Sequence, residues 1–342
     1  MVVSVTVMRC DVVIVGAGPI GLETAAVLTR EGYDVRVLDA GPIGATIART
    51  FPPQTRFFTS PERLQLSGTA IAPVNQEKLT GEEYLAYLRE YVASHGLHVD
   101  TFTRVVDGSA DPLMVVARTL AGIERAYTAR WLVLATGGTD RPRRLGVPGE
   151  DLPHVRTFLG DPHRYAGRRV LIVGGRNSAV ESALRCYRVG AQVALCYRRP
   201  QIHDRVKFWL RPEVQSLLAE GAITGYLPDE GLDISAGSVR LARAGNVAVD
   251  DVILQIGFEQ DGWLFDLFGV QRGGPRNAPV VDPQTMRSSN PAVFVVGTAI
   301  AGTQDRFEVF IENCHDHAQR VVAALAGRPA PPPRPPRPLP EA

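Results

Sequence analysis

An apolar run at residues 12–15 opens the most regular pattern of the chain. Three glycines spaced GxGxxG follow it, and an alanine- and leucine-rich segment follows the glycines. A second apolar run, at 35–38, ends in Asp39. Short apolar runs bounded by glycine are typical of buried strands, and the segment between them has the composition of a helix. The pattern therefore predicts a strand, a tight turn, a helix and a second, parallel strand.

The three glycines have different physical roles. Gly16 permits the tight turn out of the strand, Gly18 lets backbone N–H groups approach a pyrophosphate, and Gly21 lets the helix pack close to the strand. The start of the helix adds unpaired N–H groups and the positive end of its dipole. Asp39 stands where a carboxylate accepts hydrogen bonds from ribose hydroxyls. Together these parts, all within about thirty residues, predict a dinucleotide site.

A second copy of the pattern begins roughly 160 residues downstream. It predicts a strand at 169–173, a turn at 174–179, a helix at 180–189 and a strand at 192–196. Arg176 stands in place of the middle glycine. The chain is therefore expected to hold two nucleotide-binding units.

The acid that ends the first unit has no counterpart in the second. The strand at 192–196 is followed by Tyr197, Arg198 and Arg199. Arginines at this point can pair with a 2′-phosphate through charge-assisted hydrogen bonds, whereas a carboxylate would repel it. The second site is therefore predicted to favour NADP over NAD. The alternative interpretation is that both arginines are solvated surface.

The rest of the chain predicts further strands, two helices and two irregular segments. Strands are expected at 99–106, 114–119, 127–134, 249–256 and 291–296, and helices at 82–94 and 309–325. Residues 40–68 are rich in Gly, Pro, Thr and aromatic residues, so we expect a loop beside the first site. The proline-rich end, 327–342, is expected to be disordered or to form polyproline II.

Composition narrows the class of protein. The 342 residues suffice for two domains, and the net charge of +1 gives no bulk attraction to nucleic acid or to a membrane surface. No apolar run reaches the length of a membrane span, and the first residues lack the cationic start of a signal peptide. Those residues fit either a short edge strand or a start site misplaced upstream of Met8. We therefore expect a cytoplasmic enzyme that binds neither nucleic acid nor membrane.

The cysteines give no local redox or metal motif. They stand at positions 10, 186, 196 and 314, far apart and without a CxxC pair. Neither a zinc site nor a neighbouring redox pair is predicted from this spacing. Cys314 lies in the first turns of the expected last helix, and a helix N-terminus lowers the pKa of a thiol. It is therefore the candidate redox cysteine, with a buried packing role as the alternative.

Several stretches resemble flavoproteins with two dinucleotide-binding domains. Thioredoxin reductase is a compact example, and the resemblance is stronger to the bacillithiol-disulfide reductase family, over roughly residues 9–326. The stretches that carry it are QTRFFTSPERLQL (54–66), VPGEDLP (147–153), GGRNSAVESAL (174–184), VKFWLRPE (206–213) and FIENCHDH (310–317). They are far more specific than either glycine motif.

This resemblance implies an α/β fold class with two dinucleotide-binding domains. Each is Rossmann-like with three layers (ββα), and the NADPH domain is inserted in the FAD domain. The expected boundaries are 1–140 and 258–326 for the two parts of the FAD domain, 141–257 for the NADPH domain, and 327–342 for the tail. A homodimer or homotetramer is the assembly that the resemblance implies.

The resemblance also implies a set of cofactor-binding residues. FAD would contact Gly16, Gly18, Pro19, Ile20, Gly21, Asp39, Gln54, Val105, Thr136, Gly137, Gly297 and Ile311. NADPH would contact Gly174, Gly175, Asn177, Ser178, Ala179, Arg198, Arg199 and Lys207. No metal site is expected.

One position departs from the family pattern. Members of that family have a cysteine within the first glycine motif as the proposed nucleophile on the disulfide, and here Ile20 stands at that position. An aliphatic side chain cannot form a mixed disulfide. The second domain also lacks the CxxC of thioredoxin reductases, and Thr298 replaces an aspartate common there. The catalytic residue is therefore left unassigned, apart from the candidate Cys314.

The functional hypothesis is an NADPH-dependent, FAD-containing oxidoreductase that passes electrons to a low-molecular-weight disulfide or a small redox protein. One alternative is a ferredoxin/flavodoxin–NADP reductase-like electron transferase, a class that shares the fold and also lacks the cysteines. A second is an FAD-holding redox sensor without turnover. A third is a monooxygenase, although the fingerprint at 158–163 is shorter than the usual one.

Overall fold

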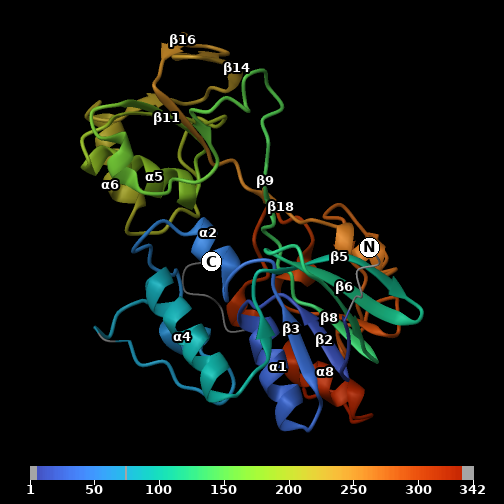
Figure 1. Cartoon of the computed structure of the whole chain (residues 1–342). Helices are drawn as coiled ribbons and strands as arrows, with labels where there is room; N and C mark the ends of the chain where they lie inside the picture. The colour runs from blue at the N-terminus through green and yellow to red at the C-terminus, as the bar shows by residue number, and fades with distance from the viewer. Residues whose placement is uncertain (1–5, 74, 333–342) are drawn as a thin grey trace. The chain divides into compact units, whose positions relative to one another are not determined.

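The structure, a computed structural model, describes residues 6–73 and 75–332 (Figure 1). The chain divides into two compact units. The first contains the described residues up to Arg141 and those from Phe258 onward, and the second is Pro142–Gly257. The second unit is thus a continuous segment that interrupts the first in sequence.

A five-stranded parallel sheet forms the centre of the first unit. Its strands follow the order β21-β8-β2-β3-β4. Their bounds are β2 (Val12–Val15), β3 (Val35–Leu38), β4 (Val99–Asp100), β8 (Trp131–Leu134) and β21 (Val293–Val295). The strands with the glycine turn, the acid and the later turns are therefore neighbours, and their carboxyl ends share one edge.

Alternate residues of β2 face two different layers. Val12 and Ile14 pack with the helices, whereas Val13 and Val15 pack with a second sheet. The helical layer contains α1 (Pro19–Arg30), α4 (Gly81–Ser94) and α8 (Asp316–Leu325), as Figure 1 shows. Because β2 is buried on both faces, it is apolar throughout instead of alternating.

The second sheet of this unit has four strands in the order β1-β7-β6-β5. Its strands are β1 (Thr6–Arg9), β5 (Thr103–Ala110), β6 (Leu113–Thr119) and β7 (Glu124–Thr128). β1 runs parallel to β7, and the other pairs are antiparallel. With α7 (Trp263–Leu267) it covers the face of the parallel sheet opposite the helices. The unit therefore has three layers, ββα.

The second unit repeats this plan. Its parallel sheet has the order β10-β17-β11-β12-β13. The strands are β10 (Val155–Arg156), β11 (Arg169–Val173), β12 (Gln192–Cys196), β13 (Thr224–Tyr226) and β17 (Asp251–Leu254). Helices α5 (Asn177–Arg188) and α6 (Arg211–Ala219) pack on one face. An antiparallel sheet of β14 (Gly231–Ser235), β15 (Ser238–Leu241) and β16 (Gly245–Ala248) packs on the other.

Short elements complete the chain. They are α2 (Ala45–Thr50), α3 (Pro61–Leu64), β9 (Arg141–Pro142), η1 (Pro162–Tyr165), β18 (Phe258–Glu259), β19 (Arg272–Gly273), β20 (Ala278–Pro279), η2 (Gly297–Ala301) and η3 (Ile311–Asn313). β9 pairs with β18, and β19 with β20. No helix in the described part of the chain is long and apolar enough to cross a membrane.

Two strands that the sequence predicts as single elements are each divided in two, so these two predictions are wrong. The run at 99–106 is divided between β4 and β5 by a turn in which Phe102 has φ +51° and its N–H donates to Gly41 O. The run at 127–134 is divided between β7 and β8. In both places the chain passes from one sheet to the other without a glycine or proline to mark the break.

One expected loop and one expected helix also differ from the structure. The expected loop at 40–68 contains α2 and α3. The expected helix at 309–325 starts later, because the backbone is extended at Phe310, and the short helix η3 precedes α8. Residues 6–9 form the short edge strand β1, while residues 1–5 and the tail 333–342 lie outside the described part.

Candidate nucleotide-binding sites

The first glycine turn is shaped by close backbone contacts. Gly16 has φ +114°, and a Cβ there would lie 2.4 Å from Ala135 O. A Cβ on Gly21 would lie 2.0 Å from Gly16 O. Apart from the residues adjoining Gly18, nothing in the described part of the chain lies within 4 Å of its Cβ position. Two glycines are thus required by packing, and the space in front of Gly18 is left open for a ligand.

The start of α1 offers hydrogen-bond donors at the same place. Pro19 occupies the first helical position, where a missing N–H costs nothing. The first helical hydrogen bond runs from Leu22 N to Gly18 O at 3.0 Å. The N–H groups of Ile20 and Gly21 therefore precede the helical ladder and can donate to an anion. This donor set fits a pyrophosphate.

Asp39 connects the end of β3 to the turn. Its Oδ2 accepts from Ala17 N at 2.7 Å, and its Oδ1 accepts from Gly41 N at 2.8 Å. Burial raises the pKa of Asp39, and the two N–H donors oppose that rise. Each carboxylate oxygen has a second lone pair, so the side chain can hold the turn and accept a ribose hydroxyl together.

The turns that follow the neighbouring strands lie against the first turn. Thr136 N would be 3.3 Å from a Cβ on Gly16, and Ile20 Cβ would be 3.2 Å from one on Gly297. Gly137 approaches the Thr298 side chain. Five of the expected FAD residues are thus brought together at one edge of the sheet: Gly16, Ile20, Thr136, Gly137 and Gly297.

Three other expected FAD residues have different surroundings. The side chain of Val105 is buried in the core between the two sheets, so only its backbone remains for a ligand. Gln54 has φ +61° and donates its N–H to Glu82 Oε1 at 2.8 Å. Ile311 begins η3. Their contact with FAD stays a prediction.

Gln260 is a site residue that the sequence pattern does not reveal. Its Nε2 donates to Gly137 O at 2.9 Å and to Ala299 O at 2.7 Å. It therefore fixes the turn after β8 to the turn after β21. No glycine motif or strand period marks this position, because its partners are distant in sequence.

His317 fixes the Gly297 turn from the helical side. Gly297 N donates to His317 Nδ1 at 3.0 Å. Burial lowers the pKa of His317 to about 4, so the ring is neutral at pH 7, with its proton on Nε2. The N–H of Gly297 is thus used within the protein and is not free for FAD.

The cysteines are poor thiolates. Burial raises the pKa of Cys10 to about 11 and those of Cys186 and Cys196 to about 12. Burial also raises the pKa of Cys314 well above its usual value, with Asp316 adding to the effect. This is opposite to the direction that a helix N-terminus predicts. The low-pKa thiol expected at Cys314 is therefore contradicted, because desolvation of the thiolate exceeds any gain from the helix dipole.

In the second glycine turn, neighbouring atoms leave no room for a side chain at either glycine. Gly174 has φ +146°, and a Cβ there would lie 2.4 Å from Gln255 O. A Cβ on Gly175 would lie 2.3 Å from the Tyr197 ring. Arg176 precedes α5 with φ −111°, which any residue adopts. A side chain in place of the middle glycine is therefore compatible with this turn.

Asn177 and Lys207 hold a loop to the start of α5. Asn177 Oδ1 accepts from Lys207 N at 2.7 Å, and its Nδ2 donates to Arg205 O at 3.4 Å. Lys207 Nζ lies 3.4 Å from Glu181 Oε2, with both side chains about one tenth exposed. These contacts give both residues a structural role. Arg198 and Arg199, by contrast, are exposed directly after β12.

Lys207→Met is expected to lower stability and to leave the Michaelis constant for NADPH nearly unchanged. Loss of a charged hydrogen bond costs about 1.5–3 kcal/mol. Urea unfolding measures the loss, and Arg188→Met, which removes an exposed pair with Glu213, is the matched control with a smaller effect. A tenfold rise in the Michaelis constant at unchanged stability would instead make Lys207 a nucleotide ligand.

Comparison with known proteins gives the class. A protein-family model described as pyridine nucleotide-disulphide oxidoreductase matches residues 13–297, so the chain belongs to this family. The chain is 29% identical to bacilliredoxin reductase Bdr of Bacillus subtilis over 325 residues, covering 92% of this chain and 97% of the relative. The structure of bacillithiol disulfide reductase Bdr from Bacillus cereus matches with a TM-score of 0.88 at 29% identity, covering 94% of this chain and 99% of that one.

A ferredoxin–NADP reductase of Ignicoccus hospitalis is 28% identical over 301 residues, covering 84% of this chain and 89% of the relative. The resemblance to the bacillithiol-disulfide reductase family and the fold class are confirmed. The protein is a flavoprotein oxidoreductase that uses FAD and a nicotinamide nucleotide.

Proposed function

We propose that the protein transfers hydride from NADPH to FAD and then passes electrons to an outside acceptor without using a cysteine of its own. The observation that carries this proposal is Ile20. This residue is 4% exposed, and its side chain lies where the first glycine turn meets the turn at Gly297. The position that a nucleophilic cysteine would occupy is thus filled by an aliphatic group.

The thiols elsewhere support the same conclusion. All four are free cysteines, and burial raises the pKa of each. A thiol is nucleophilic as the thiolate, so none of them is prepared for disulfide exchange at neutral pH. Free thiols are the expected state in a reducing cytoplasm, where we place the reaction.

The chain's own residues would bind and orient the two cofactors. When bound, these supply the hydride-transfer chemistry, and the protein supplies alignment. In the first unit, the N–H groups of Ile20 and Gly21 would bind the pyrophosphate, and Asp39 would orient the ribose. Gln260 would hold the surrounding turns in place. In the second unit, Arg198 and Arg199 would select the 2′-phosphate.

A variant with all four cysteines changed to serine or alanine is expected to keep most NADPH–dye reductase activity. Hydride transfer depends on the alignment of the two cofactors and not on a thiol. Anaerobic titration of the natural protein should consume about two electrons per FAD, without a thiolate-to-flavin charge-transfer band. Uptake of four electrons would show a redox-active dithiol and would overturn the proposal.

Ile20→Cys supplies the missing thiol and tests the acceptor. Reduction of bacillithiol disulfide should be slow in the natural protein and faster in this variant. Gly273→Cys, which adds a thiol at an open and exposed place in the same unit, is the matched control. If Cys314→Ser alone abolishes disulfide reduction in the natural protein, Cys314 is the nucleophile and the cysteine-independent route is wrong.

The second candidate is electron transfer to ferredoxin or flavodoxin. The similarity to ferredoxin–NADP reductases favours it, together with Ile20. Assays of the reduced enzyme against bacillithiol disulfide, ferredoxin, flavodoxin and quinones would choose between the acceptors. NADPH oxidation with a dye acceptor separates both enzymes from a sensor without turnover. We propose a homodimer or homotetramer, which sedimentation would test.

A further inference from the structure

A short loop lies against the second glycine turn. His203 N donates to Gly175 O at 3.1 Å, and Val206 N donates to His203 O at 3.1 Å. The loop then returns to α5 through the bond from Lys207 N to Asn177 Oδ1. These contacts place the backbone of His203 beside the turn that precedes α5, where the nucleotide is expected to bind.

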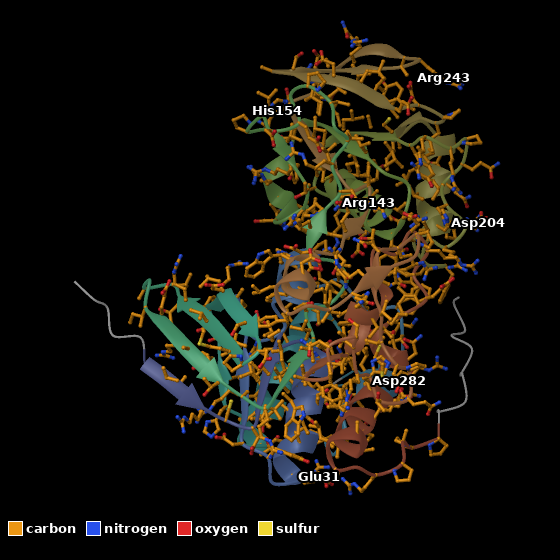
Figure 2. All side chains as sticks on the ribbon, turned by 90° about the vertical axis from the view of Figure 1, so that its right-hand side faces the viewer. Glu31, Arg143, His154, Asp204, Arg243 and Asp282 are labelled. Atoms are coloured by element: carbon orange, nitrogen blue, oxygen red, sulfur yellow. The ribbon has the colours of Figure 1, made fainter. Side chains whose placement is uncertain are left out.

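The ring of His203 has a defined tautomer. Arg205 N donates to its Nδ1 at 3.1 Å, so the neutral ring carries its proton on Nε2. Within residues 6–73 and 75–332, Nε2 has no hydrogen-bond partner. The ring is half-buried, and Asp204 next to it lies at the surface of the second unit (Figure 2). Nδ1 thus accepts a hydrogen bond within the loop, and Nε2–H is available to donate one to a ligand.

Three arginines from three segments act on the charge of this ring. Burial lowers the pKa of His203, and the charges of Arg176, Arg199 and Arg205 lower it further. Asp204 opposes them, and it is itself paired with Arg211 at 3.4 Å. Positive charges predominate around His203, which is the charge pattern of a site that takes an anion.

We propose that His203 is a specificity-determining residue that binds the 2′-phosphate of NADPH and takes up a proton as the nucleotide binds. This inference rests on the proposed preference for NADPH. A phosphate dianion placed among the cluster reverses the local field, so the imidazolium becomes the favoured form. The charged ring then donates a charge-assisted hydrogen bond from Nε2. NADH has no such phosphate, so its binding moves no proton.

The sign of the pH dependence follows from these charges. The free ring is neutral at pH 7 because its pKa is lowered, and the bound phosphate raises that pKa. At a pH between the pKa of His203 in the free protein and its higher pKa in the complex, binding of NADPH takes up protons. The affinity for NADPH therefore increases as pH falls through the pKa of the complex. Below the pKa of the free ring, the affinity gains nothing more from this histidine. The phosphate itself has a pKa of about 6 and protonates in the same range, which weakens binding, so this contribution must be subtracted from the measured pH dependence.

Calorimetric titration of the oxidised holoenzyme with NADP⁺ and with NAD⁺ tests the proposal. Buffers of different ionisation enthalpy at one pH give the number of protons taken up. We expect proton uptake with NADP⁺ only, and a dissociation constant at least about threefold lower at pH 6.5 than at pH 8.5. His203→Gln removes the titrating group and should abolish the extra uptake. His163→Gln, at an exposed histidine of the same unit, is the matched control and should behave as the natural protein.

His203→Arg gives a permanent cation at the same position. It is expected to bind NADP⁺ tightly at both pH values, with no proton uptake beyond that of the glutamine variant. If His203→Gln keeps the proton uptake and pH dependence of the natural protein, the inference is overturned while the preference for NADPH stands. If the natural protein binds NADP⁺ and NAD⁺ equally at every pH, the NADPH assignment fails as well.

Discussion

Gly18→Val is expected to give a folded, colourless protein. Among the residues that the structure describes, none beyond the chain neighbours of Gly18 lies within 4 Å of the new Cβ, so the fold should tolerate the change. The same space is where backbone N–H groups approach the pyrophosphate, and a branched side chain there excludes it. The visible spectrum of the purified variant, with FAD released by denaturation, measures the loss.

The control for this variant is Gly273→Val, which makes the same change in a short strand of the same unit. Its Cβ position is also open, and it is far in sequence from the glycine turn. It should stay yellow with full FAD content. If Gly18→Val retains normal FAD occupancy while remaining folded, the first site is wrongly assigned.

Changing Arg198 and Arg199 together to glutamine is expected to raise the Michaelis constant for NADPH at least tenfold. Each charge-assisted bond to the phosphate is worth about 1.5–3 kcal/mol, and about 1.4 kcal/mol corresponds to a factor of ten. The constant for NADH should change little, because it has no 2′-phosphate. Steady-state kinetics with a dye acceptor measures both.

A double change of Arg240 and Arg243 to glutamine removes the same charge from the same unit. Both are exposed at β15 and the turn after it, and Arg243 is labelled in Figure 2. This control separates a local contact from a general loss of positive charge. Equal effects of the Arg198 and Arg199 change on NADPH and NADH would show that the pair does not read the phosphate.

Both glycine turns could be predicted because local chemistry determines them. The runs at 12–15 and 169–173 are strands with the expected bounds, since residues 12–15 and 170–173 are apolar and buried on both faces and each run ends at a glycine with positive φ. Arg176 marks the limit of this reasoning. It occupies a glycine position without strain, so the backbone alone does not explain which residue stands there.

The parts that could not be predicted depend on contacts between distant segments. The break at Phe102 follows from the chain passing between sheets, and nothing in its neighbourhood signals a turn. Gln260 and His317 reach the turns at Gly137 and Gly297 from far along the sequence. The position of Cys314 near the start of the last helix predicted a low pKa for its thiol, but burial raises that pKa.

The interruption of the first unit by the second has a consequence for biosynthesis. Strand β21 adds to the edge of β8 from beyond the inserted segment, and Gln260 and the Gly297 turn come with it. Because chains emerge from the ribosome N-terminal end first, the second unit is complete before this last part of the first unit exists. With FAD bound where we propose, loading is a late event, and a chain that ends after residue 257 would contain the complete second unit and a flavin-free first sheet whose β8 edge is open.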